Sequence, residues 1–242
     1  MRPFLTAQWR SLAMLNYPVE PAVLRPLVPR GTELDHWQGR TYVSLVGFRF
    51  LDTRVLGLPI PFHRNFSEIN LRFYVRRAVG EEIRRGVVFV RELVPRALVT
   101  WVARSLYNEP YRTVSIRHRV SESGGSPESL SYAWKTAGRW HRLSAAAEGR
   151  VEPTATGSEE EFITEHHWGY TRQRNGGTIE YRVEHSRWSV AAASHASLHG
   201  EPELTYGPTF GAILGGPPAS AFVADGSAVA VYRGRRLPAL EP

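Results

Sequence analysis

The stretch that decides the fold runs from Asn65 to Val75 and reads NFSEINLRFYV. Side chains alternate between the two faces of a β-strand, so this stretch divides into two sets of residues. One set is apolar and predicts a strand face in the core: Ile69, Leu71, Phe73 and Val75. The other set carries hydrogen-bonding groups: Glu68, Asn70, Arg72 and Tyr74.

This polar face has two interpretations. In the first, it faces solvent, and a glutamate–arginine pair across it contributes less than about 1 kcal/mol to stability. In the second, it lines a polar interior, where a carboxylate beside a guanidinium holds an acidic or polar ligand. The alternation alone favours the solvent-facing interpretation.

Around this stretch, the sequence predicts a series of mostly antiparallel strands bounded by glycine and proline. Residues 66–79 and 86–93 form a predicted hairpin with a longer loop at residues 80–85. The other predicted strands are residues 41–50, 111–120, 130–136, 141–151, 178–185, 188–193 and 228–232.

Few helices are predicted. Residues 21–28 and 95–107 each begin with a proline, which suits the first turn of a helix. A third helix runs from Ser158 to about Trp168, because Ser158 and Glu161 match a capping box. No repeat or linker divides the chain, so we expect one domain over residues 1–242. Its predicted class is mainly β (α+β), a single decorated, mostly antiparallel β-barrel or sandwich.

The composition limits the classes of function. The formal net charge is +7, from 30 Lys and Arg against 23 Asp and Glu, and every cation except Lys135 is an arginine. The arginines are dispersed along the chain, whereas nucleic-acid-binding proteins concentrate charge on one face, so we expect no specific nucleic-acid partner. The chain has no cysteine, which excludes thiol catalysis, disulfides and thiolate metal sites.

The sequence shows no membrane-spanning or signal segment and no motif typical of metal or cofactor binding. No stretch has the apolar length of a membrane span or of a signal peptide, so we expect a cytoplasmic protein. His195 and His199 stand four residues apart, but the segment lacks the glutamate of a zinc-protease helix, so we expect no metal. The sequence contains neither a phosphate-binding glycine loop nor a Gly-x-Ser-x-Gly motif, and we expect no cofactor.

A family resemblance rests on several spaced motifs. The pattern Phe66-x-Glu68-x-Asn70-Leu71-Arg72-x-Tyr74-Val75 resembles the signature of the YqjF-like family of uncharacterised bacterial proteins. Further blocks in the same order are similar to that family: residues 86–89, Ala103-Arg104, Pro110-Tyr111, residues 162–165 with Tyr170, and His185-x-x-Trp188. The resemblance spans most of the chain. It implies an acetoacetate decarboxylase-like fold, a β-barrel with decorating helices and a polar interior cavity.

That implied cavity favours the interior interpretation of the polar face and a small polar or anionic organic ligand. In an enzyme, Glu68 would be the general acid or base, with Tyr74 or His185 assisting proton transfer. Arg72 would anchor an anionic group of the ligand. The other expected ligand-binding residues are Asn70, Arg91, Glu92, Arg104, Tyr111 and Trp188.

The alternative to an enzyme is a non-catalytic ligand-binding or sensor module, in which the same residues only orient the ligand. A large upward shift in the pKa of Glu68 would favour catalysis, and its neutralisation by Arg72 would favour binding. Homo-oligomeric assembly is compatible with the sequence.

The resemblance also bears on one reaction. Active acetoacetate decarboxylases carry an Arg-Glu strand end followed by Gly-x-Pro-Lys-Lys, whose lysine forms a Schiff base. Here Arg91-Glu92-Leu93 resembles the strand end, but residues 94–99 follow it with no lysine. Arginine cannot replace a primary amine in an imine, so we expect no Schiff-base decarboxylation.

Overall fold

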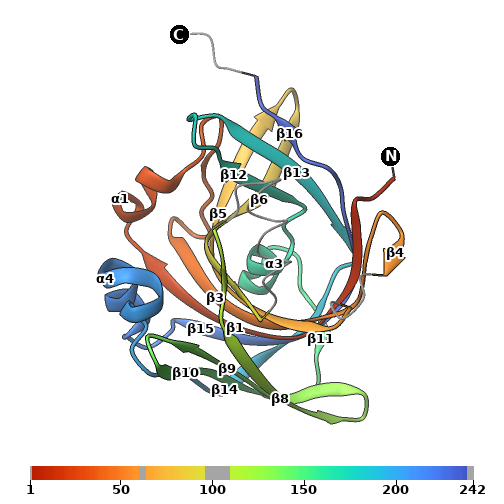
Figure 1. The fold of residues 1–242 in the computed structure, drawn as a ribbon, viewed down its shortest axis with the longest axis vertical. Coiled ribbons are helices and arrows are strands. Elements are labelled where there is room, and N and C mark those ends of the chain that lie inside the picture. The colour runs from red at the N-terminus through yellow and green to blue at the C-terminus, as the bar shows by residue number, and fades with distance from the viewer. Residues whose placement is uncertain (1, 60–63, 96–109, 239–242) are drawn as a thin grey trace.

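Strands dominate the structure, a computed structural model that describes residues 2–59, 64–95 and 110–238. Seven strands form a ring in the order β13-β12-β6-β5-β3-β1-β15, and the ring closes because β13 also pairs with β15 (Figure 1). These strands are β1 (Leu5–Val19), β3 (Thr41–Val55), β5 (Phe66–Val79), β6 (Glu82–Val94), β12 (Trp168–Arg172), β13 (Thr178–His185) and β15 (Ser220–Val231).

A second layer continues from β15 through four more strands and packs on the outside of the ring. They are β14 (Ser189–His199), β10 (Arg139–Ala147), β9 (Ser126–Thr136) and β8 (Ser115–Ser123). Short strands complete the inventory: β2 (Glu33–Leu34), β4 (Leu58–Pro59), β7 (Tyr111–Thr113), β11 (Glu152–Pro153) and β16 (Arg235–Arg236). Among the described strands only the β6–β12 and β6–β7 pairings are parallel. The protein is therefore mainly β, and where the sequence predicted a barrel it has one large mixed sheet that contains a ring of strands.

The helices of the described residues are short: α1 (Pro21–Leu24), the 3₁₀ turn η1 (Arg25–Leu27), α3 (Glu159–Thr164) and α4 (Glu203–Leu214). The cap predicted for α3 is present, since the Ser158 hydroxyl accepts a hydrogen bond from the Glu161 amide. The sequence did not predict α4, which Gly207 (φ 81°) and Pro208 interrupt. Apart from Pro95, the predicted helix at residues 95–107 lies outside the described residues. No helix that the structure describes has both the length and the apolar character to cross a membrane.

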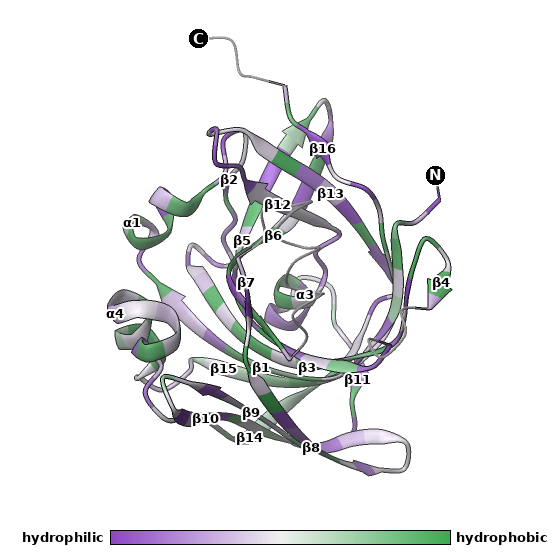
Figure 2. Ribbon diagram, viewed as in Figure 1, coloured by the Kyte–Doolittle hydropathy of each residue, from purple (hydrophilic) through white to green (hydrophobic). Residues whose placement is uncertain are grey.

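Both faces of β5 are buried from Phe66 to Val75, so the solvent-facing interpretation is wrong. The apolar face packs outward on the second layer, where Ile69 and Leu71 share a core with Tyr132 of β9. The other face points into the ring, where Phe66 and Tyr74 share a second core with Phe162 of α3. Figure 2 shows hydrophobic residues along β1 and β3, which lie between these two cores.

The structure differs from the predicted strands at the β5–β6 turn and at β1. The β5–β6 hairpin turns at Gly80 and Glu81, because Val79 already pairs with Glu82, so the predicted loop at residues 80–85 is too long. Gly80 has φ 59°, which a turn of this kind requires. The sequence did not predict β1, which has buried residues on both faces over most of its length and shows no clean alternation.

Bulges in two ring strands, β6 and β1, keep more side chains on the inner face than strict alternation allows. In β6, Leu71 pairs with Arg91 but Arg72 pairs with Phe89, so Phe89 and Glu92 face the same side. In β1, a bulge at Ser11 (φ 56°) leaves both Trp9 and Leu12 facing inward. These bulges shape the interior of the ring.

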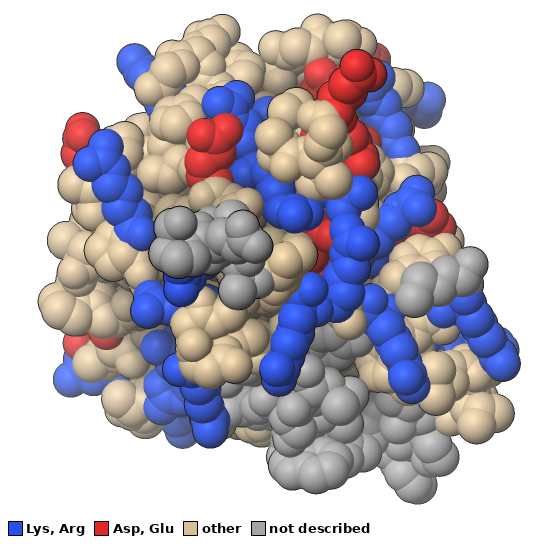
Figure 3. All heavy atoms as spheres, turned by 90° about the horizontal axis from the view of Figure 1, so that it is seen from above, with Lys and Arg blue, Asp and Glu red and all other residues tan. Residues whose placement is uncertain are grey.

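An ion network lies at one end of the ring. The buried carboxylate of Glu180 on β13 accepts hydrogen bonds from Arg77, Arg84 and Arg235 at 2.7–3.0 Å. Burial opposes its ionisation, but these arginines hold the pKa of Glu180 below its ordinary value. Seen from above, this face carries many cationic side chains with acidic ones among them (Figure 3). The network fixes β16 onto β13.

Candidate functional site

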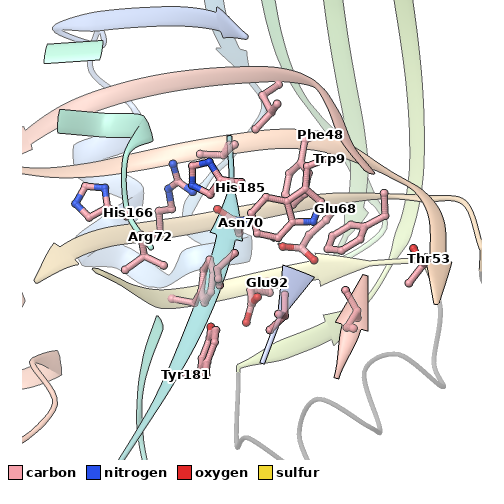
Figure 4. A pocket seen from close by; sticks show the side chains of 18 of the residues that line it. Trp9, Phe48, Thr53, Glu68, Asn70, Arg72, Glu92, His166, Tyr181 and His185 are labelled. Carbon is pink, nitrogen blue, oxygen red and sulfur yellow. Dashed lines mark hydrogen bonds between the residues drawn. The ribbon is translucent and has the colours of Figure 1, made fainter. Parts of the chain in front are cut away.

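The interior of the ring holds a cavity of about 390 Å³, hereafter the ring cavity, shown in Figure 4. Its wall consists of successive cross-strand rows. Trp9, Phe50 and Phe66 form one row, and Phe48 pairs with Glu68 in the next. Val46, Asn70 and Glu92 follow, and then Arg72 and Phe89. An aromatic layer and an arginine layer therefore lie at different depths, with Glu68 between them.

Glu68 is the central ionisable group of the ring cavity. Its side chain is almost wholly buried, with 2% exposure. The amide of Asn70 donates a hydrogen bond to one carboxyl oxygen and the hydroxyl of Tyr111 donates one to the other, each at 3.1 Å. Burial raises the pKa of Glu68 to about 7, against the lowering effects of these two hydrogen bonds and of Arg72. Glu68 is thus poised between its acid and its base form at neutral pH.

Arg72 does not neutralise Glu68. No carboxylate of the described residues lies within 4.0 Å of its guanidinium, which is buried at 7% exposure for the residue. One terminal nitrogen donates to the Ile163 carbonyl at 3.1 Å, and Nε has no hydrogen-bond partner among the described residues. A buried cation without a paired anion is costly to the fold and attracts an anionic ligand.

Tyr74 does not line the ring cavity, which corrects the expectation that it joins Glu68 there. Its hydroxyl donates a hydrogen bond to Ser44 at 2.6 Å. Its ring packs against Phe162, at 5.2 Å between centroids, and against His166, at 4.6 Å. Alternation gives the face of Tyr74 correctly, but these two side chains cover it.

Arg91 also departs from the expectation, whereas Glu92 lines the ring cavity. The bulge in β6 places Arg91 on the outer side of the sheet, where its charge acts on the buried Tyr206 of α4. The amide of Glu92 bonds to the Pro110 carbonyl, which fixes the strand end beside β7. Arg104, the remaining expected ligand-binding residue on this side, lies outside the described residues.

His166 lines the ring cavity and was not among the expected site residues, because no motif in the sequence marks it as a binding or catalytic group. It follows α3 directly and is buried, and neither ring nitrogen has a hydrogen-bond partner among the described residues. Burial, together with the charges of Arg85 and Arg72, lowers the pKa of His166 well below its ordinary value. The neutral ring offers one N–H donor and one acceptor nitrogen.

His185 and Trp188 line the ring cavity where the sequence motif placed them together. Their rings lie 4.8 Å apart, and His185 also stacks on His167 at 4.5 Å. The indole N–H of Trp188 donates to the Ser227 hydroxyl. Burial lowers the pKa of His185. This pair contributes a flat, largely neutral wall.

Several polar atoms in the cavity wall lack a hydrogen-bond partner among the described residues. Besides Arg72 and His166, they include Asn70 Oδ1, Trp9 Nε1 and Thr53 Oγ1. Such groups are rare in folded proteins, and each costs about 1–3 kcal/mol. A ligand with hydrogen-bonding groups can supply the missing partners of such atoms.

The described residues contain no group of three or more histidine, aspartate or glutamate side chains that could hold a metal ion. Lys135, the single lysine of the chain, is exposed on β9 in the second layer and does not line the ring cavity.

The comparisons with known proteins agree with this fold. The model of the DUF2071 family, described as an uncharacterized conserved protein, matches residues 6–228. The uncharacterized protein YqjF of Bacillus subtilis (strain 168) is 28% identical over 189 residues, which cover 76% of this chain and 74% of YqjF.

Solved structures with the same fold include enzymes. Acetoacetate decarboxylase from Legionella pneumophila superposes with a TM-score of 0.70 at 12% identity, covering 98% of this chain and 87% of its own. The enduracididine biosynthesis enzyme MppR superposes with a TM-score of 0.67 at 14% identity, and the match covers 98% of this chain and 90% of the MppR chain. An acetoacetate decarboxylase-like enzyme from Sphingomonas wittichii RW1 superposes with a TM-score of 0.66 at 12% identity, and the match covers 99% of this chain and 95% of that enzyme.

Proposed function

We propose a function from the premise that the chain belongs to the DUF2071 family of uncharacterized conserved proteins, and that it has an acetoacetate decarboxylase-like fold. In this proposal the ring of strands acts as a barrel whose cavity binds a small oxo acid. Glu68 removes and returns a proton on the carbon beside the carbonyl group. The observation that carries the proposal is a buried glutamate whose pKa is about 7, in one cavity with a buried arginine that has no carboxylate partner among the described residues.

Arg72 would bind the carboxylate of the oxo acid. A guanidinium binds a carboxylate through charge-assisted hydrogen bonds, which are about twice as strong as neutral ones. His166 and Arg72 both contact the Tyr74 ring. The His166 ring centroid lies 4.6 Å and the Arg72 guanidinium carbon 5.7 Å from the Tyr74 centroid. The overall charge of +7 would attract an anionic ligand at long range.

The chemical step needs only groups in the ring cavity. The Glu68 carboxylate takes a proton from the carbon next to the ketone. The electrons of the broken C–H bond form a carbon–carbon double bond, and the carbonyl electrons move to the oxygen, which becomes an enolate. N–H donors of Arg72 and the neutral His166 would stabilise that oxygen. Return of the proton from Glu68 regenerates the carboxylate.

A structural neighbour supports the ligand class. MppR has been solved in complex with pyruvate, a small 2-oxo acid. Its identity to this chain is 14%, so the common element is the fold. The support for this chain therefore comes from its own Glu68, Arg72 and His166.

Proton exchange in heavy water tests the proposal. Pyruvate, 2-oxobutanoate and 4-methyl-2-oxopentanoate are incubated with the protein, and proton NMR follows loss of the hydrogens at C3. We expect exchange above the buffer rate, reduced at least about 100-fold in Glu68→Gln. Ser67→Ala, a neighbour whose hydroxyl bonds to His118, is the matched control and should retain exchange.

Equal exchange rates in the wild type and in Glu68→Gln would contradict the catalytic role. Binding of these acids without any exchange would identify the protein as a non-catalytic binding module, the second candidate function. The pH profile gives a further check: exchange should increase with pH and level off above about 7, as Glu68 ionises.

A further inference from the structure

We infer that the acid bound in the ring cavity is elongated and ends in an aromatic ring, which occupies the aromatic layer of Trp9, Phe50 and Phe66. This inference rests on the proposed function, since it takes the carboxylate to lie at Arg72. It adds which chemical group of the ligand binds at the end of the cavity opposite Arg72.

The aromatic layer is an ordered group of rings. Phe50 and Phe66 stack at 4.6 Å with an interplanar angle of 13°. Trp9 stands edge-on to Phe50 at 5.7 Å and to Phe48 at 5.5 Å. All four side chains line the ring cavity. Faces and edges of rings are thus both presented to an occupant, and an aromatic occupant can complete stacked or edge-to-face contacts with them.

The aromatic layer and the arginine lie at different depths along β5. On its inner face Phe66, Glu68, Asn70 and Arg72 follow one another at two-residue intervals. At about 3.3 Å per residue, the backbone position of Arg72 is about 13 Å from that of Glu68 and about 20 Å from that of Phe66. Figure 4 shows Arg72 and His166 on one side of the view, and Trp9, Phe48 and Thr53 toward the other.

The size of the cavity leads to the same ligand class. The cavity volume of about 390 Å³ lies within the range of about 300–1,000 Å³ that is usual for pockets that hold drug-sized ligands. Pyruvate, with six non-hydrogen atoms, is much smaller than such a ligand. An acid that is anchored at Arg72 and passes Glu68 fills the remainder of the cavity only if it continues to the aromatic layer.

The experiment measures affinities of two series of unreactive acids by calorimetry: acetate, butanoate and decanoate, and phenylacetate, 3-phenylpropanoate and 5-phenylpentanoate. We expect affinity to rise about fourfold per added methylene within each series. The phenyl acids should bind about fivefold tighter than straight-chain acids of similar non-hydrogen atom count. Phe66→Leu should abolish this phenyl preference while the straight-chain acids still bind.

Phe73→Leu is the matched control, because Phe73 lies in the same strand but faces the outer core. The phenyl preference should persist in it. The inference would be overturned if the acids bind without any phenyl preference, or if Phe66→Leu and Phe73→Leu lose that preference equally. Either result would leave the proposed function standing. No binding of any acid, long or short, would overturn both.

Discussion

Substitution of Glu68 by glutamine should change how the stability of the protein depends on pH. Glutamine has nearly the same shape, accepts the Asn70 hydrogen bond through its carbonyl, and lets the Tyr111 hydroxyl accept from its NH₂ group instead of donating. The substitution therefore removes only the ionisable carboxyl group. The pKa of Glu68 rises from 4.5 to about 7 in the folded protein. At about 1.4 kcal/mol per pH unit, the difference corresponds to about 3 kcal/mol.

The sign follows from proton binding. The folded protein binds the Glu68 proton more tightly than the unfolded chain does, so this contribution to stability is complete below pH 4.5. It is lost progressively as the pH rises to about 7. Glu68→Gln does not undergo this loss. Its unfolding free energy relative to that of the wild type should therefore increase by about 3 kcal/mol between pH 4.5 and 7 and stay constant above.

Urea unfolding at a series of pH values measures this difference in unfolding free energy. The contributions of titrating groups that both proteins share cancel in the difference. Ile69→Val serves as the control, because this buried neighbour on the opposite face does not titrate. Its substitution should lower stability by about 1 kcal/mol at every pH. A difference between Glu68→Gln and the wild type that is constant from pH 4.5 to 8 would refute the reasoning.

Three further predictions concern other parts of the molecule. Glu180→Gln should lower the unfolding free energy by about 2–3 kcal/mol at pH 7, because three arginines lose their carboxylate. That difference should shrink as the pH falls through the lowered pKa of Glu180, and chemical denaturation at pH 3 to 7 checks both points. Gly169→Ala should lower stability by about 1–3 kcal/mol, since its Cβ would meet the Tyr181 ring at 2.1 Å, and a thermal unfolding curve measures the loss. Borohydride treatment with acetoacetate should leave the intact mass unchanged, and a stable adduct at Lys135 would contradict this.

The sequence predicted the composition of the site better than its shape. Alternation over residues 65–75 correctly separated the two faces of β5, because a two-residue period holds wherever a strand is regular. It could not distinguish solvent from a closed interior, since glutamate and arginine occupy either place. Only the pairing of β13 with β15, far apart from β5 in the sequence, closes the ring around these side chains.

The errors have local causes. Arg91 was expected in the site together with Glu92 on the strength of the family resemblance. The bulge that turns Arg91 to the outer face leaves no regular signal in the sequence. Tyr74 is on the predicted face, yet Phe162 and His166 of a distant segment cover it. His166 itself could have been proposed from its position directly after the capped helix, but its burial depends on tertiary packing against β5.

A crystal structure with 4-methyl-2-oxopentanoate at saturating concentration tests the central claim most directly. We predict that the acid lies in the ring cavity, with its carboxylate within hydrogen-bond distance of the Arg72 guanidinium and its C3 carbon facing the Glu68 carboxyl group. An acid bound outside the ring, or bound inside it with its carboxylate turned away from Arg72, would contradict the account.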